Sequence, residues 1–521
     1  MNSSALEAFD VRGAASRPTL VVFTTFMVVF LFGCAHLTSA VPSALQLQTE
    51  TGAGLSSCDA RANNTASKLD ACIQQSSLWQ QLREFQRIAD ANPDPQGHGN
   101  RDTGSPGYEA SVDHVARIMR GAGYHVTIQP YTYHATQVMG TPVFGTSSGE
   151  YALGRDWFVA RRSGSGALTA PIQPPSGSLD GCSPADFAGF KRGHIALLAR
   201  GSCSVEVQVA NARDAGAGAA ILYITEGGPF ETHLDDPADI PVIGFASRAV
   251  GEELLNRYRS GAAPLVHVDV RMGRITGVDY NVIADSPYGD PHHVLVIDAH
   301  LDSIYGAGML DNASGSTSIL ETALALASTP TTNRLRYIWF GGEELGLLGS
   351  HYYTRNLSAP ELQRIVFDFD VDVTATPNYD IAIANPAKAG NVGRFPPNVV
   401  PQSRVGNDAI EDYFSGIGIV ARAVFFGNDG TDSNSFSLVG VPNTGILTRQ
   451  DCCKRPVEVR TWGGYLGDYE GVVPGFTGGC VDIPDRWCDN LSNNDPFVLG
   501  LVSKAVAQVT LQLANDGSLG R

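Results

Sequence analysis

The sequence predicts a mixed α/β fold, in which a mostly parallel sheet is sandwiched between helices and interrupted by an inserted β-rich module. In the second half of the 521 residues, short apolar strands alternate with helical segments. This alternation is typical of a parallel sheet covered on both faces. Between about residues 140 and 274 the pattern changes to short strands and glycine-rich turns, which indicates a separate inserted unit.

The predicted elements of the main domain follow in chain order. Two helical patterns lie within residues 78–122, and residues 125–133 form a strand rich in β-branched and aromatic residues. Beyond the insertion we expect strands at 294–299, 335–340 and 365–373, and helices around 316–328, from about Glu344 and near 497–514. Further elements are expected at 404–414, 421–426 and 444–448. The chain is therefore divided into residues 1–40 (an export signal), 41–140 (an N-terminal segment and the start of the main domain), 141–274 (the inserted module) and 275–515 (the main domain).

Composition limits the class of protein. With 43% hydrophobic and 17% charged residues the chain is globular. Its formal net charge is -17, and no Lys/Arg-rich run offers the cationic surface that phosphate neutralisation requires. We therefore expect no nucleic-acid partner.

The N-terminus carries an apolar run at residues 19–33, preceded by Arg12 and Arg17 and followed by small residues up to Ala40. A bilayer-spanning helix needs about 20 apolar residues, so this run favours a cleavable export signal over a stable membrane span. Cleavage after Ala40 would give a secreted, extracellular protein. Because the segment ending at Cys34 resembles a lipobox, a cell-envelope lipoprotein anchored at Cys34 is the alternative.

The cysteines indicate an oxidising compartment, because setting Cys34 aside leaves an even number of the nine. Local spacing pairs Cys58 with Cys72 and Cys182 with Cys203. The other four are Cys452, Cys453, Cys480 and Cys488, and spacing leaves their connectivity open. Since vicinal disulfides are strained, we favour separate bridges from Cys452 and Cys453 to Cys480 and Cys488.

Three acidic segments each follow a predicted strand, where open α/β sheets place their sites. In the first, His300 offers a metal-binding imidazole that Asp302 can support, and Asp311 follows nine residues after Asp302. In the second, Glu343 and Glu344 repel each other unless a cation lies beside them, so that one can bind a metal and the other can act as a general base. The third has aspartates at 368, 370 and 372 on one face of a strand, with Asp372 at the rim.

Together, VLVIDAHLDS, MLDNASGS, YIWFGGEELGLLGSHYY and VDVTATPN resemble successive motifs of the co-catalytic di-zinc aminopeptidase family, which also includes glutamate carboxypeptidases and the transferrin receptor ectodomain. The inserted stretch resembles a protease-associated domain. The resemblance covers most of residues 58–515 and implies a zinc-exopeptidase fold.

The resemblance also implies that the protein binds two zinc ions and hydrolyses peptides. One zinc is held by His300 and Asp372, the second partly by Glu344, and Asp311 bridges both. Glu343 is the general base for a metal-activated water, and Asp302 supports catalysis. The substrates would be peptides with a free N-terminus, which lose their N-terminal residues. The alternatives are a carboxypeptidase or dipeptidase of the same fold, or a catalytically impaired binding protein.

One metal ligand departs from the family pattern. The family completes its second zinc site with a late histidine in a cysteine-flanked loop, whereas this chain has no histidine after His351. Counting forward from Cys480 puts Asp482 in that place, and counting back from Cys488 puts Asp485 there. A carboxylate can bind zinc at a similar distance, so we predict Asp482 as the ligand, with Asp485 as the alternative.

Overall fold

The computed structural model describes Cys58 and residues 61–225, 232, 234, 236–262, 264–424, 430–449, 454–466, 480–481 and 487–520. Residues 52–521 form one compact unit. The predicted export signal, Cys34, Cys452, Cys453, Asp482 and Asp485 lie outside the described residues.

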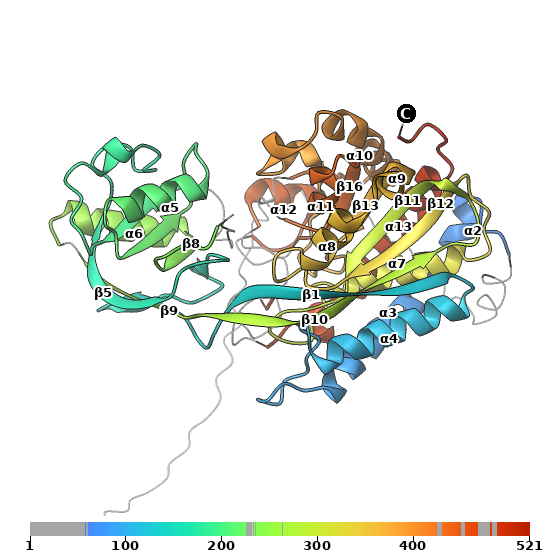
Figure 1. Cartoon of the computed structure of the whole chain (residues 1–521), viewed down its shortest axis with the longest axis horizontal. Helices are drawn as coiled ribbons and strands as arrows, with labels where there is room; N and C mark the ends of the chain where they lie inside the picture. The colour runs from blue at the N-terminus through green and yellow to red at the C-terminus, as the bar shows by residue number, and fades with distance from the viewer. Residues whose placement is uncertain are drawn as a thin grey trace, which may run out of the picture. The chain divides into compact units, whose positions relative to one another are not determined.

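The main sheet has the strand order β1-β10-β12-β11-β13-β16-β14-β15 (Figure 1). Its strands are β1 (His125–Val138), β10 (Met272–Asp285), β11 (Asp290–His300), β12 (Asn333–Phe340), β13 (Ile365–Val371), β14 (Ala382–Ile383), β15 (Arg422–Ala423) and β16 (Asn443–Leu447). The central strands β12, β11, β13 and β16 are parallel, and so are β14 and β15, whereas the pairs β1–β10, β10–β12 and β14–β16 are antiparallel. The prediction of a mixed, mostly parallel sheet is confirmed.

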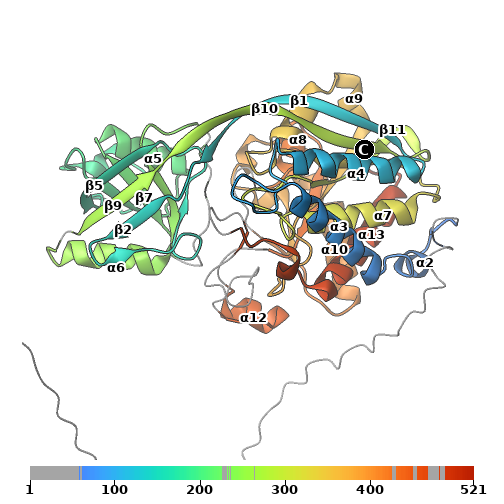
Figure 2. The ribbon, with the colours of Figure 1, turned by 90° about the horizontal axis from the view of Figure 1, so that it is seen from below.

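Helices cover both faces of this sheet (Figures 1 and 2). Helices α2 (Ala66–Asp70), α3 (Gln75–Ala91), α4 (Pro106–Gly121), α7 (Ala313–Leu326), α10 (Val399–Gly416) and α13 (Pro496–Ala514) share one core with the sheet. Helices α8 (Leu348–Asn356), α9 (Ala359–Arg364) and α11 (Ser433–Leu438) cover the opposite face, and α12 spans Pro456–Trp462. Because both faces are buried, the central strands read as continuous apolar runs.

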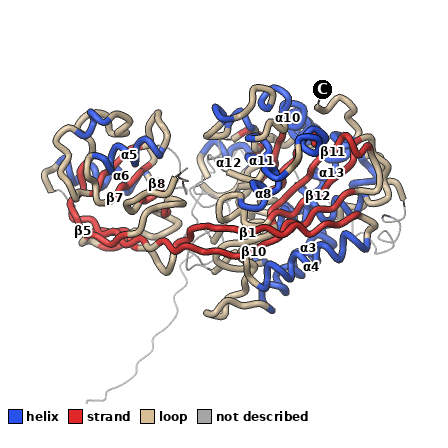
Figure 3. The backbone as a smooth tube through the Cα atoms, in the orientation of Figure 1, coloured by secondary structure: helices blue, strands red, loops and turns tan. Residues whose placement is uncertain are grey.

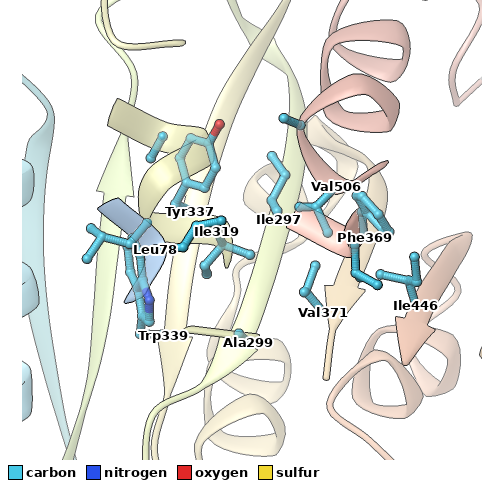
Figure 4. Packing of buried hydrophobic residues seen from close by; sticks show 14 of the residues in the cluster. Leu78, Ile297, Ala299, Ile319, Tyr337, Trp339, Phe369, Val371, Ile446 and Val506 are labelled. Carbon is cyan, nitrogen blue, oxygen red and sulfur yellow. The ribbon is translucent and has the colours of Figure 1, made fainter. Parts of the chain in front are cut away.

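The core fixes which way each strand residue points. On β11, Ile297 and Ala299 point toward α7 and α13, where they meet Ile319 and Val506 (Figure 4). Val296, one position away, belongs to the core under α8 and α11. His300, an even number of positions from Val296, therefore lies on the α8 and α11 side of the sheet.

Helix α13 is long and apolar enough to cross a membrane, with a mean hydropathy of 1.5, and is the one such helix within the described ranges. However, 67% of that window is buried inside the protein. It packs against α7, α10 and α3, so its apolar surface is used by the core.

The inserted module forms a second sheet in the order β3-β2-β9-β5-β6-β7-β8-β4. Its strands are β2 (Val143–Thr146), β3 (Gly149–Glu150), β4 (Phe158–Val159), β5 (Gly166–Gln173), β6 (Ile195–Ala199), β7 (Ala219–Tyr223), β8 (Val242–Ala246) and β9 (Leu265–Val270), and its helices are α5 (Val205–Asp214) and α6 (Arg248–Arg259). Strands β1 and β10 pair along their whole length as a ribbon (Figure 3). In chain order β1 leads into β2, and β9 leads back into β10, so this ribbon connects the inserted module to the main sheet.

Three disulfides lie among the described cysteines. The bonds Cys58–Cys72 and Cys182–Cys203 are as predicted. Cys480 and Cys488 are bonded to each other, so the expectation that they bridge separately to Cys452 and Cys453 is wrong. The intervening loop brings their Cα atoms to 5.1 Å, within the range of a disulfide, and leaves neither sulfur for another bond.

Candidate metal centre

The ends of three neighbouring parallel strands bring the predicted site residues together. β11 ends at His300, β12 ends just before the Glu343–Glu344 turn, and β13 ends just before Asp372. The potential ligand atoms of His300, Asp311 and Asp372 lie within 4.8 Å of one another, and so do those of His300, Glu343 and Glu344. His300 therefore joins two groups of donors at one edge of the sheet.

The His300 imidazole is 1% exposed and contacts carboxylates on both sides. Its Nε2 lies 2.8 Å from Asp311 Oδ1 and 3.4 Å from Asp372 Oδ1. Burial lowers the pKa of His300, but the carboxylates of Asp302, Asp311 and Asp372 outweigh burial and raise it. The ring is thus held where a cation would meet one nitrogen and two carboxylates.

The acids of the site are costly to ionise without a cation. Burial, followed by the nearby Asp311 carboxylate, raises the pKa of Asp372 to about 6. Burial also raises the pKa of Glu343, against the opposing charges of His300 and Arg161. Asp372 Oδ1 is buried and accepts no hydrogen bond from the described residues. One imidazole among several buried carboxylates is a donor set that zinc accepts, so the residues fit this metal.

Asp302 lies beside His300 and beside the turn that carries both glutamates. His300 Nδ1 lies 3.2 Å from the Asp302 backbone carbonyl and 3.6 Å from its carboxylate. That carboxylate also accepts hydrogen bonds from the backbone N–H groups of Glu343 (3.2 Å) and Glu344 (3.4 Å), and from Thr103 Oγ1 (2.8 Å). Asp302 thus fixes the turn that carries both glutamates.

This turn replaces the helix expected from about Glu344. Gly342, Gly346 and Leu347 have positive φ values of 67°, 102° and 56°, and α8 begins only at Leu348. Left-handed positions of this kind interrupt a helix. Both glutamates therefore sit in a short buried turn whose position depends on Asp302.

Two buried residues that the sequence did not reveal support Asp311. The Asp489 carboxylate accepts hydrogen bonds from the backbone N–H of Leu310 (2.9 Å) and of Asp311 (3.0 Å). Fully buried Arg101 donates to the carbonyls of Leu301 (2.6 Å) and Ala307 (3.0 Å) in the same loop. The position of Asp489, directly after Cys488, was the one available signal.

Asn312 connects Asp311 to the strand that carries Asp372. Its Oδ1 accepts hydrogen bonds from the N–H groups of Gly315 (2.8 Å) and Val373 (3.0 Å), and its Nδ2 donates to the Val371 carbonyl (3.0 Å). The residues on both sides of Asp372 are therefore bonded to one amide.

The other predicted ligands lie beyond what the structure describes. Asp482 and Asp485 fall in the undescribed segment 482–486, although Cys480, Cys488 and Asp489 on either side are placed. The choice between the two aspartates stays a prediction.

The parallel-sheet fold and the cluster of buried donors define a metal-dependent hydrolase whose site lies at the carboxyl edge of the strands. Residues 281–472 match the model of peptidase family M28, and residues 165–254 match the PA domain. The "probable lipoprotein aminopeptidase LpqL" of Mycobacterium tuberculosis is 31% identical over 462 residues, which are 84% of this chain and 85% of that protein. The chain belongs to peptidase family M28, the co-catalytic zinc aminopeptidases, and carries an inserted PA domain. It is therefore an exopeptidase of the metallo-aminopeptidase class.

Solved structures show the same fold. The aminopeptidase from Aneurinibacillus sp. strain AM-1 has a TM-score of 0.61 and 22% identity, and the match covers 87% of this chain and 97% of that one. BSAP, described as a zinc aminopeptidase from Bacillus subtilis, has a TM-score of 0.54 and 21% identity, with 86% and 96% covered.

Proposed function

We propose that the protein removes N-terminal residues from peptides with a free N-terminus, with Glu343 as the general base. The observation that carries this proposal is the convergence of His300, Asp311 and Asp372 on one side and Glu343 and Glu344 on the other, with their ligand atoms within 4.8 Å in each group. A glutamate beside a metal position, and not needed as its ligand, is the arrangement expected for this hydrolysis.

Two zinc ions per chain are proposed. His300 and Asp372 would hold the first, Glu344 would hold the second with Asp482 (or Asp485), and Asp311 would bridge them. The imidazole and carboxylate donors support this choice of metal. When bound, zinc polarises the scissile carbonyl and lowers the pKa of the attacking water.

The chain's own residues would move the proton and hold the reacting groups. The Glu343 carboxylate would take a proton from the attacking water and deliver it to the leaving amine nitrogen. Its position is supported by the hydrogen bond from its own N–H to Asp302. The acids around His300 also provide a negative environment for the α-ammonium group of the substrate.

We also propose that the protein acts outside the cytoplasm, either secreted or as a cell-envelope lipoprotein anchored at Cys34. The three disulfides support an oxidising compartment, because such bonds are rare in reducing ones.

A single substitution tests the proposed reaction. Glu343→Gln should bind as much zinc as the unchanged protein, measured by metal analysis, and lose about 100-fold to 10,000-fold in kcat on leucine p-nitroanilide. Glu411→Gln, on the exposed side of α10, is the matched control and should keep both. Turnover retained in Glu343→Gln would remove this residue from the base role. Less than one zinc per chain in the unchanged protein would overturn the metal-dependent mechanism.

A further inference from the structure

Two adjoining cavities lie beside the proposed metal centre. The first, of about 570 Å³, is lined by Glu344 and by residues of the main domain and the inserted module. The second, of about 630 Å³, extends along α8. Because His134, Arg162, Asp236 and Leu348 line both, the two cavities form neighbouring parts of one cleft.

This cleft is rich in arginine, although the protein as a whole is acidic. The arginines that line it, called the cleft arginines below, are Arg161, Arg162, Arg274, Arg355 and Arg394. Among the described lining residues, Asp236 and Glu344 are the acids. The chain has 36 Lys and Arg against 53 Asp and Glu, so this local excess of cations runs against the overall composition.

The backbone of the inserted module holds Arg161 in place. The Arg161 N–H donates to the Thr232 carbonyl (2.8 Å), and the Arg161 carbonyl accepts from the Leu234 N–H (3.2 Å). Its side chain, 23% exposed, reaches Glu344, with Nη2 3.4 Å from Oε2. A guanidinium thus stands directly beside the proposed centre.

Two of the cleft arginines have no partner that would explain their position. The side chains of Arg274 on β10 and Arg355 on α8 are exposed and form no hydrogen bond or ion pair within the described part of the chain. Arg161 pairs with the proposed metal ligand Glu344, and Arg162 and Arg394 also have interactions of their own. Pairing with acids therefore does not explain the positions of Arg274 and Arg355.

We propose that the cleft arginines form a subsite for a carboxylate that lies downstream of the first residue of the substrate. The guanidinium fork matches a carboxylate with two parallel hydrogen bonds. Cations gathered in a cleft also focus the field and attract anionic ligands. The substrates preferred are then peptides that carry a negative charge after the scissile bond.

This inference rests on the proposed aminopeptidase function and adds a substrate class to it. The carboxylate has two sources, which are the C-terminal α-carboxylate of a short peptide and the side chain of an internal Asp or Glu. Two pairs of peptides separate them. One pair is Leu-Gly-Gly as the free acid and as its C-terminal amide, and the other is the amides of Leu-Glu-Gly-Gly and Leu-Gln-Gly-Gly.

The experiment measures kcat/KM for each peptide with the zinc-loaded enzyme, with product analysis to identify the residue released. In the unchanged enzyme at least one charged peptide should exceed its neutral partner by about 10-fold to 100-fold, as charge-assisted hydrogen bonds allow. The ratio should shrink as salt is raised, because screening weakens the attraction. In the double variant Arg274→Gln, Arg355→Gln the ratio should fall toward one.

Arg404→Gln is the matched control, because Arg404 is exposed on α10 and does not line either cavity. It should keep the ratio of the unchanged enzyme. Ratios near one for both pairs in the unchanged enzyme, with leucine still released, would overturn the subsite and leave the aminopeptidase function standing. A ratio unchanged in the double variant would also overturn the subsite. Release of C-terminal glycine, or no hydrolysis of any peptide, would overturn both proposals.

Discussion

The Asp489 carboxylate accepts a 3.0 Å hydrogen bond from the backbone N–H of Asp311. Asp489 directly follows Cys488, whose disulfide to Cys480 closes the late loop. The loop expected to supply the last metal ligand is thereby linked to the residue proposed to bridge both ions.

Replacing Asp489 should weaken metal binding. Asp489→Asn keeps one acceptor oxygen and puts an N–H₂ in place of the other, so the donors Leu310 N–H, Asp311 N–H and Asn493 Nδ2 can no longer all be satisfied and the loop that carries Asp311 would shift. Losing a partner of this kind usually costs about 10-fold to 100-fold in metal affinity. Competition with a chelator measures this change. Asp495→Asn is the control, because Asp495 caps α13 and should affect stability without changing zinc affinity; equal affinities in both variants would contradict the role of Asp489.

Asp302 should act on turnover through the glutamate turn. Asp302→Asn weakens the acceptor for the N–H groups of Glu343 and Glu344, and should lower kcat by about 10-fold to 100-fold. Thr103→Val removes one donor to Asp302 and should lower kcat by about five-fold, as the loss of one neutral donor implies. Thr103→Ser restores a hydroxyl and should recover the activity. A Thr103→Ser variant as slow as Thr103→Val would show that the hydroxyl is not what matters.

Much of the fold could be predicted from the sequence, because its central elements have strong patterns. Strands β11, β12 and β13 are buried on both faces, so each gives an apolar run that ends at a polar motif. The start of α8 was predicted four residues too early, since the Glu343–Glu344 pair looks like a helix N-terminus. Backbone angles at Gly346 and Leu347 decide that boundary, and leucine gives no sign of a positive φ.

Asp311 could be predicted from the family motif that contains it, and other site residues could be predicted because they follow strand ends. His300, Glu343 and Asp372 do so. Arg101, in contrast, lies 206 residues before Ala307, and Asp489 lies 178 residues after Asp311, so their contacts depend on tertiary packing. The cleft arginines come from separate parts of the chain, so no local run of basic residues marks them.

Removing the Asn312 side chain should destabilise the fold. In Asn312→Ala the buried N–H groups of Gly315 and Val373 and the carbonyl of Val371 lose their partner. Buried unpaired groups of this kind should lower the free energy of unfolding by about 3 kcal/mol in total. Denaturant unfolding measures this change. The control is Asn398→Ala, whose amide bonds are exposed and should contribute less than about 0.5 kcal/mol.

His114 on α4 should make stability depend on pH. Its side chain is 8% exposed, its Nδ1 lies 2.8 Å from Arg117 Nη2, and its ring packs edge-on against Phe85. Burial and the Arg117 charge, with a smaller contribution from Arg87 and against that of Glu84, lower the pKa of His114 to about 4.

The folded protein therefore holds a proton on His114 less readily than the unfolded chain, in which the pKa is about 6.5. As the pH falls from about 6.5 to about 4, the unfolded chain takes up the proton first, and stability is lost in that window by at most roughly 3 kcal/mol. His114→Phe removes this contribution. Between about pH 7 and about pH 4.5 the free energy of unfolding of the variant should therefore fall less than that of the unchanged protein. Urea unfolding without metal measures both. Because His125 is exposed, His125→Gln should behave like the unchanged protein. An equal loss in His114→Phe and the unchanged protein would mean that other groups, and not this buried imidazole, determine acid sensitivity.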